Sequence, residues 1–164
     1  MSLQTIEIKS AKIAFDIEKT REHLTAFNKP CDCQYCRNYY KNLKDNFELI
    51  GFLANFGVDY SRAEEIFPID LGNTKESLIN YRIYYCVAGS VSKRFSIKKE
   101  GFSVSFDASS NIDVGHEITN EFFFLVIDID LPYILDEGRE LPPPSFFGKC
   151  VNKITSIVKK ILGF

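Results

Sequence analysis

Residues 122–131 read FFFLVIDIDL, and this stretch indicates the fold more clearly than any other part of the chain. Side chains alternate between the two faces of an extended strand, so its residues divide into two sets. One face is apolar throughout and carries Phe123, Leu125, Ile127, Ile129 and Leu131. The other face carries Phe122, Phe124, Val126, Asp128 and Asp130. The pattern predicts a central β-strand.

Further strands are expected on either side of this one. Leu78–Ala88 (LINYRIYYCVA) is a long run of β-prone residues. Arg94–Lys98 and Phe102–Phe106 both alternate, and Lys99–Gly101 between them suits a hairpin turn. Near the start of the chain, Gln4–Glu18 alternates loosely, which fits one bent strand or two short ones.

A helical block from about residue 33 to residue 66 interrupts the β structure. From Gln34 onward, the spacing of the large side chains is helical. Asp45 is followed three residues later by Glu48, which matches a capping box at the start of a second helix. Gly57 suits the left-handed residue that closes that helix.

A second capping box at Ser61 and Glu64 predicts a short helical turn that Pro68 ends. The helices therefore lie together between stretches of consecutive strands, rather than alternating with them. This order favours an α+β domain with a mainly antiparallel sheet or sandwich of about five to seven strands and an inserted helical hairpin near Cys33–Phe56.

The last residues, 145–164, predict a basic amphipathic helix (SFFGKCVNKITSIVKKILGF). Its apolar side chains fall within an arc of about 160° at helical spacing. The expected organisation is a single domain over residues 1–138, a Pro-rich linker over 139–145 and the C-terminal helix over 146–164. The residues expected to contact a membrane or partner are Phe147, Val151, Ile154, Val158 and Ile161 on the apolar stripe, with Lys153, Lys159 and Lys160 on the polar face.

Three surfaces remain open as the one that buries this stripe: the chain's own domain, a protein partner or second copy, and an anionic membrane surface. The polar face has four lysines and no acidic residue, a composition typical of helices that lie at a membrane surface. Docking on the protein itself would equally bury the apolar side chains and leave the lysines in water.

Charge is distributed unevenly along the chain. The net charge is −2 over 164 residues, and the tail's four lysines leave −6 for residues 1–144. An acidic body argues against nucleic acid as a partner, because phosphate binding needs a contiguous basic surface. The N-terminal residues lack the plan of a signal peptide, so we expect a cytoplasmic protein, with peripheral attachment to a membrane as one outcome for the tail.

Cys31, Cys33 and Cys36 form the clearest chemical signal in the chain. Three thiols within six residues at a helix start can converge on one tetrahedral zinc ion, which takes soft ligands and usually four of them. We therefore expect either no cofactor or a structural zinc on these three cysteines. The candidates for a fourth ligand are His23, Cys86 and His116.

Two other interpretations of the cysteines stay open. The thiols of the Cys33-Gln-Tyr-Cys36 motif can act in redox chemistry, because a helix N-terminus and the nearby Arg37 lower a thiol pKa. Buried reduced thiols that pack the helix start are the plainer alternative, since free cysteine is among the most buried residue types. The alternating Asp128 and Asp130 suit a solvated strand face better than a cation site.

The stretch Cys31–Tyr39 resembles a C-x-C-x-Y-C-R-N-Y signature of small, functionally unassigned bacterial proteins. The segments at Phe52–Asp59 and Leu131–Glu137 resemble two later stretches of the same family. The resemblance spans about residues 6–137 and implies a compact bacterial domain. It implies no activity, substrate or catalytic residue.

No set of residues in the sequence supplies a nucleophile, a base and a charge stabiliser together. The sequence therefore predicts no catalytic residue and favours a non-enzymatic binding or interaction protein. A zinc- or thiol-dependent enzyme that uses Cys31, Cys33 and Cys36 is the alternative.

Overall fold

The computed structural model describes residues 3–25, 31–70, 76–108 and 121–139. These residues form seven strands: β1 (Leu3–Ile8), β2 (Ala11–Asp16), β3 (Glu65–Asp70), β4 (Ile79–Val91), β5 (Phe95–Lys98), β6 (Phe102–Asp107) and β7 (Phe122–Leu131). They also form three helices: α1 (Ile17–Thr25), α2 (Gln34–Leu43) and α3 (Phe47–Ala54). The predictions for His116, for the linker beyond Arg139 and for the C-terminal helix lie outside the described residues.

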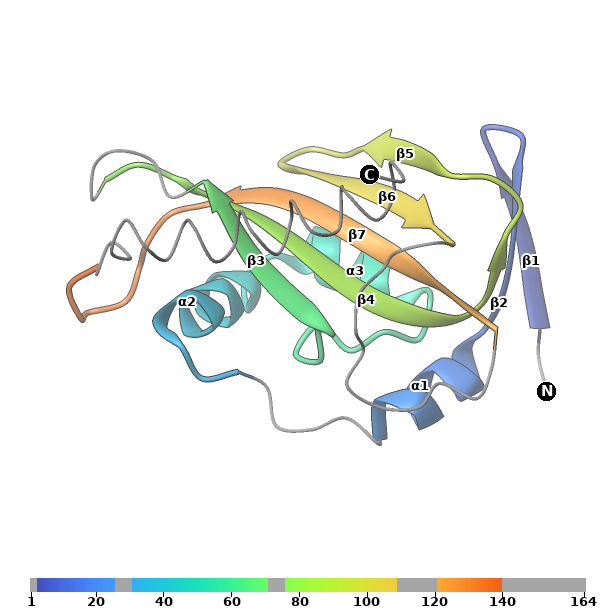
Figure 1. Cartoon of the computed structure of the whole chain (residues 1–164), viewed down its shortest axis with the longest axis horizontal. Helices are drawn as coiled ribbons and strands as arrows, with labels where there is room; N and C mark the ends of the chain where they lie inside the picture. Colours follow the sequence, from blue (N-terminus) through green and yellow to red (C-terminus); the bar gives the residue numbers. More distant parts are fainter. Residues whose placement is uncertain (1–2, 26–30, 71–75, 109–120, 140–164) are drawn as a thin grey trace, which may run out of the picture.

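The strands form one antiparallel sheet in the order β1-β2-β4-β7-β6-β5, and β3 also pairs with β4 (Figure 1). β7 pairs along its whole length with the first ten residues of β4, from Ile79 opposite Leu131 to Ala88 opposite Phe122. The other edge of β4 is shared, because β3 pairs with its first half and β2 with its last three residues. The expected mixed α+β fold with a mainly antiparallel sheet is therefore confirmed.

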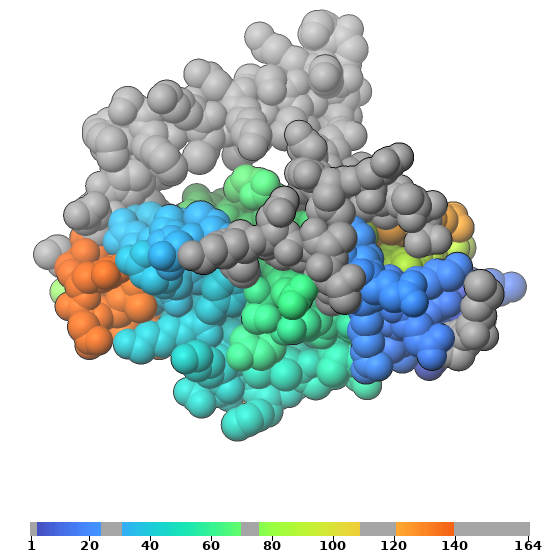
Figure 2. Space-filling view, turned by 90° about the horizontal axis from the view of Figure 1, so that it is seen from below, coloured from blue at the N-terminus to red at the C-terminus, as the bar shows by residue number. Residues whose placement is uncertain are grey.

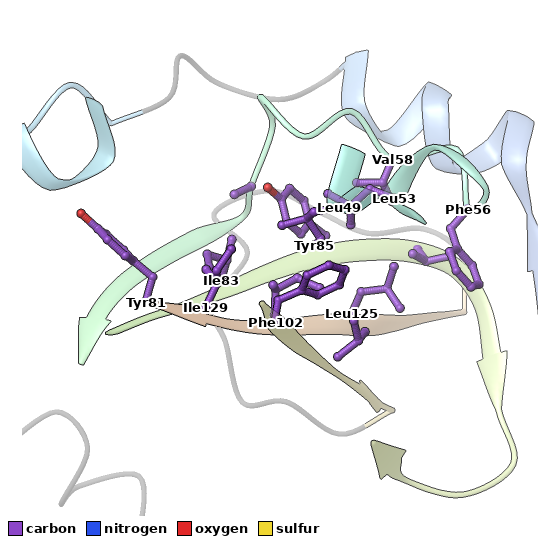
Figure 3. Packing of buried hydrophobic residues seen from close by; sticks show 14 of the residues in the cluster. Leu49, Leu53, Phe56, Val58, Tyr81, Ile83, Tyr85, Phe102, Leu125 and Ile129 are labelled. Atoms are coloured by element: carbon purple, nitrogen blue, oxygen red, sulfur yellow. The ribbon is translucent and has the colours of Figure 1, made fainter. Parts of the chain in front are cut away.

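The alternation in β7 divides its side chains between two layers as the sequence predicts. Phe123, Leu125, Ile127 and Ile129 lie in the main core with side chains of β4 and the helices. Figure 3 shows Leu49 and Leu53 of α3 facing the side of the sheet that carries Tyr85. Burial of each such side chain contributes about 1.5–3 kcal/mol, which holds the helical layer on this face. On the opposite face, Phe124 and Val126 pack with Cys86 of β4.

The helical hairpin forms where it was expected, with one change at its cap. Asn46, rather than Asp45, is the N-cap of α3, and its side chain accepts a hydrogen bond from the Leu49 N–H at 3.0 Å. Gly57 adopts φ +78° after the helix, as predicted, and a Cβ there would lie 2.8 Å from the carbonyl oxygen of Ile17. Glycine at this position therefore satisfies both the turn and the close approach of α1.

The helical turn predicted to start at Ser61 and to end at Pro68 is wrong, because residues 65–70 are strand β3. The backbone N–H of Glu64 donates to the Tyr84 carbonyl at 2.8 Å, and pairing with β4 continues from there. Pro68 is tolerated because β3 pairs on one side only among the described residues, and the register shifts just after it. Pairing with a long neighbouring strand overrides the local capping signal.

The N-terminal alternation corresponds to two strands, not to one bent strand. β1 and β2 form a hairpin in which Lys9 and Ser10 have φ of 49° and 61°. Positive φ at both turn residues is the geometry of a tight two-residue hairpin. The hairpin leads directly into α1, which lies along the β4 edge between β2 and β3 (Figure 1).

Candidate metal and thiol site

The cysteine cluster, consisting of Cys31, Cys33 and Cys36, lies at the start of α2. Cys33 is the N-cap residue, with an extended backbone (φ −72°, ψ 160°), and Cys36 is the third residue of the helix. Cys31 and Cys33 are exposed, whereas Cys36 is buried. The three sulfur atoms lie within 4.8 Å of one another. The structure therefore brings the three predicted residues together, two of them within reach of solvent.

The buried side-chain amide of Asn38, two residues after Cys36, holds α2 in place. Asn38 is fully buried, and its Nδ2 donates to the Tyr81 hydroxyl at 3.1 Å and to the Pro132 carbonyl at 3.0 Å. Its Oδ1 accepts a hydrogen bond from the Ile134 N–H at 2.8 Å. Because an unpaired buried polar group costs about 1–3 kcal/mol, these bonds hold α2 against both the sheet and the chain that leaves β7.

The first turn of α2 also contacts the segment after β7, which Figure 2 shows in orange beside the light blue of α2. The guanidinium of Arg37 donates to the carboxylate of Glu137 and to the Asp32 carbonyl. The Tyr133 hydroxyl donates to Oε1 of Gln34 at 3.1 Å. Two of the stretches quoted for the sequence resemblance, residues 31–39 and 131–137, are therefore in direct contact.

The electrostatic environment of the cluster shifts the pKa values of Cys33 and Cys36 in opposite directions. Hydrogen bonding from the Cys36 thiol is the largest cause that lowers the pKa of Cys33, to about 5. The backbone amides of Cys36 and Tyr35 and the thiol of Cys31 act in the same direction, against a smaller effect of burial. The pKa of Cys36 is raised, first by its hydrogen bond to Cys33 and then by burial. At neutral pH the pair therefore carries one thiolate, on the exposed Cys33, and one thiol.

An open pocket of about 470 Å³ adjoins the cluster on the side of Cys31. Its lining residues come from the loop before α2, from α2 and from two later segments: Cys31, Asp32, Arg37, Tyr40, Lys41, Lys44, Ser61 and Leu135. Three of these side chains are cationic and one is acidic. Two of these cations are paired with acidic side chains next to the lining, Arg37 with Glu137 and Lys41 with Asp136 at 3.8 Å, so the charges around the pocket are largely balanced.

A second group of titratable side chains, which we call the buried group, consists of His23, Glu64 and Cys86. His23 Nε2 lies 2.9 Å from Glu64 Oε1, and their side chains are 11% and 2% exposed. The Cys86 thiol lies within 4.8 Å of both, and burial, with a smaller effect of Glu64, raises its pKa to about 12. These residues come from α1, from the chain just before β3 and from β4.

His23 and Cys86 were candidates for the fourth ligand of the cysteine cluster, but the structure places them in this separate group with Glu64. No sequence pattern indicates Glu64 as a site residue, because its spacing from Ser61 suggests a helix cap. Only the pairing of β3 with β4 carries Glu64 to the edge where α1 and Cys86 lie.

The aspartates of β7 are in ordinary pairs on the sheet surface. Asp128 accepts hydrogen bonds from Nε and Nη2 of Arg82 at 2.7 and 3.1 Å. Asp130 accepts one from Nδ2 of Asn80 at 2.7 Å. Among the described residues, neither aspartate belongs to a group of three potential metal ligands. This agrees with the interpretation of a solvated strand face.

Comparison with known proteins returned no match to a family model, to a curated protein or to a solved structure. Within the described ranges, no helix combines the length and the apolar character that crossing a membrane requires. The geometry of the cysteine cluster and its surroundings is therefore the main indication of function.

Proposed function

We propose that this protein is a non-enzymatic binding protein whose cysteine cluster holds a zinc ion. The observation that carries this proposal is the convergence of three sulfur atoms within 4.8 Å at a helix start. Three sulfurs bonded to one tetrahedral zinc at about 2.3 Å would lie about 3.8 Å apart. The required adjustment is small, and the exposed Cys31 and Cys33 lie on chain that can move without disturbing the core.

The donor set also suits a thiophilic cation. Zinc binds thiolates, and the environment of the cluster favours the deprotonated form of Cys33 before any metal arrives. Cys36 then anchors the set, because it belongs to a helix that Asn38 ties to the sheet. With Cys31, Cys33 and Cys36 as three ligands, a fourth position is left for water, for a side chain outside the described residues or for a partner.

Metal analysis of the purified, reduced protein tests this proposal. We expect about one zinc per chain in the wild type, and loss of most of it in Cys33→Ser and Cys36→Ser. Cys86→Ser is the matched control, because it removes a thiol from the buried group and should retain zinc. A wild type that takes up no zinc from a chelating indicator, or a Cys86→Ser variant that loses it equally, would contradict the proposed site.

The second candidate is a zinc- or thiol-dependent enzyme that uses the same three cysteines. The pocket beside Cys31 favours it, since a substrate bound there would lie next to that thiol. A zinc ion with three protein ligands and a replaceable water is the arrangement of catalytic sites, whereas four protein ligands indicate a structural one. X-ray absorption spectroscopy of the zinc-loaded protein separates the two by the number of sulfur ligands and the presence of an oxygen ligand.

We further propose that residues 145–164 dock through their apolar stripe on the chain's own domain, on a protein partner or second copy of the chain, or on an anionic membrane surface. The pattern of that segment supports this, and its four lysines suit an anionic surface. Sedimentation with anionic vesicles tests it, with Ile154→Asp on the stripe and Thr155→Asp as the matched control on the polar face. Binding to vesicles that only Ile154→Asp abolishes supports the membrane; no vesicle binding, with a lower Tm or a changed mass for Ile154→Asp, supports docking on protein.

A further inference from the structure

We propose that Cys33 and Cys36 form a reversible disulfide by exchange with low-molecular-weight disulfides, and that Cys33 is the attacking sulfur. This activity goes beyond metal binding and needs no metal. It is inferred from the placement of the two sulfurs at the start of α2, from the difference in their accessibility and from the pocket beside Cys31.

The spacing of Cys33 and Cys36 at the start of α2 brings their sulfurs together. An N-cap side chain lies over the third residue of its helix, which is why serine and threonine caps reach the N–H at that position. Cys33 occupies the N-cap of α2 and Cys36 that third position, and their sulfurs lie within 4.8 Å. A disulfide needs a sulfur–sulfur bond of about 2.05 Å. Because Cys33 has an extended, exposed backbone ahead of the helix, its side chain can close this gap without unwinding α2.

The two thiols differ in their exposure to solvent. Cys33 is exposed, whereas only 6% of Cys36 is exposed. An incoming disulfide therefore contacts Cys33 first, and Cys36 is positioned to react only with a sulfur already bonded to Cys33. Accessible attack followed by an intramolecular step distinguishes a reactive pair from two buried structural thiols.

The chemical class of the disulfide follows from the space beside the cluster. The pocket that adjoins Cys31 has a volume of about 470 Å³, which suits one arm of a small disulfide rather than a protein disulfide. Its charges are largely balanced, because Arg37 is paired with Glu137 and Lys41 lies 3.8 Å from Asp136. The substrate is therefore defined by its size and not by its charge.

The exchange balances in atoms and electrons. The Cys33 thiolate attacks one sulfur of the disulfide RSSR, whose S–S bond breaks to release one RS⁻ and leave a mixed disulfide on Cys33. Cys36 loses its proton to the released thiolate, and its sulfur attacks Sγ of Cys33, which releases the second RS⁻; that thiolate takes a proton from water. The two cysteines are oxidised by two electrons in total, and RSSR is reduced to two thiols.

Oxidised glutathione is the probe, used with full-length, metal-free protein and mass spectrometry after alkylation. We expect wild-type protein to lose two hydrogens and to yield a Cys33–Cys36 cross-linked peptide, with Cys86 alkylated only after unfolding. Cys31→Ser should behave in the same way. The double variant Cys31→Ser, Cys36→Ser should instead accumulate one glutathione on Cys33, because among the described residues no other sulfur is grouped with Cys33 to resolve it.

Cys33→Ser should react at least about tenfold more slowly than wild type, since the remaining thiols lack the exposed N-cap position. Equal oxidation of Cys33→Ser and wild type would overturn the proposal, as would a wild-type cross-link that joins Cys31 to either partner instead. Circular dichroism of each variant shows whether it is folded.

This test is independent of the proposed zinc site, because the protein is treated with a chelator beforehand. Failure to bind zinc leaves the exchange result unchanged, and failure to exchange leaves the zinc stoichiometry unchanged. If both hold, oxidation removes two of the three metal ligands, a consequence that rests on the proposed function.

Discussion

The cysteine cluster and the buried group are alike in composition but are built in opposite ways. Each places three potential ligand atoms within 4.8 Å. The cysteine cluster comes from six consecutive residues and has two exposed members, whereas the buried group joins three distant elements and is almost closed to solvent. Proximity of ligand atoms alone therefore does not make a site reactive. Access and protonation state distinguish a reactive site from a structural contact.

The largest difference should appear in the rates at which the two sites react with iodoacetamide. In reduced, metal-free protein at pH 7, Cys33 should be modified at least about a thousandfold faster than Cys86, because only an accessible thiolate reacts. The pKa of Cys33 is about 5 and that of the buried Cys86 about 12. Timed alkylation with peptide mass spectrometry measures both rates. Similar alkylation rates for the two cysteines in the folded protein would contradict this difference in access and protonation. In denaturant the two rates should converge.

Removal of the carboxylate from the buried group should destabilise the fold. Glu64→Ala removes the carboxylate oxygen that lies 2.9 Å from His23 Nε2, and loss of a contact at a site this little exposed costs about 1–3 kcal/mol. Glu64→Gln keeps an acceptor at the same position and should cost less. Urea unfolding measures the free energy of unfolding for each. An alanine variant as stable as wild type would show that the contact is not structural.

The two cysteines should shift stability with pH in opposite directions. The pKa of Cys86 is raised to about 12, so its contribution is full below the unfolded pKa of about 8.5 and is lost as pH rises toward 12, by up to about 1.4 kcal/mol per unit. The pKa of Cys33 is lowered to about 5, so its contribution is present above about 8.5 and is lost as pH falls through 5.

Urea unfolding at pH 8 and pH 10, with a phosphine reductant, tests this difference. Cys86→Ala should lose less stability than wild type between the two values, while Cys33→Ala should lose slightly more, because the contribution of Cys33 still increases with pH up to about the unfolded pKa of 8.5. Buried tyrosines with raised pKa, such as Tyr81, contribute equally to all three proteins and cancel in the comparison. An unchanged slope in Cys86→Ala would mean that the Cys86 thiol is not buried.

The smallest effect is expected at the surface of the cysteine cluster. Arg37→Gln removes the exposed ion pair with Glu137 and should leave the Tm nearly unchanged, because exposed pairs contribute little to stability. Thermal unfolding in low and high salt measures this. A large loss of stability would show that the contact between α2 and the segment after β7 depends on this pair rather than on Asn38.

Much of the fold follows from local patterns, and its exceptions have a common cause. The alternation of residues 122–131, the hairpin turn at Gly101 and the left-handed Gly57 all appear where the sequence places them. The cap at Asp45 was displaced by one residue because Asn46 offers the same kind of acceptor. The turn expected after Ser61 became strand β3 because pairing with β4 supplies more hydrogen bonds than one capping box.

The cysteine cluster is encoded locally, because its three residues share one helix start and local backbone geometry sets their separation. The buried group forms through tertiary contacts, since His23 and Glu64 are 41 positions apart and meet through the sheet. The same holds for Asn38, whose partners Tyr81 and Pro132 are 43 and 94 positions away. Contacts between distant residues depend on strand order and register, which the packing of the whole core fixes and no local pattern encodes.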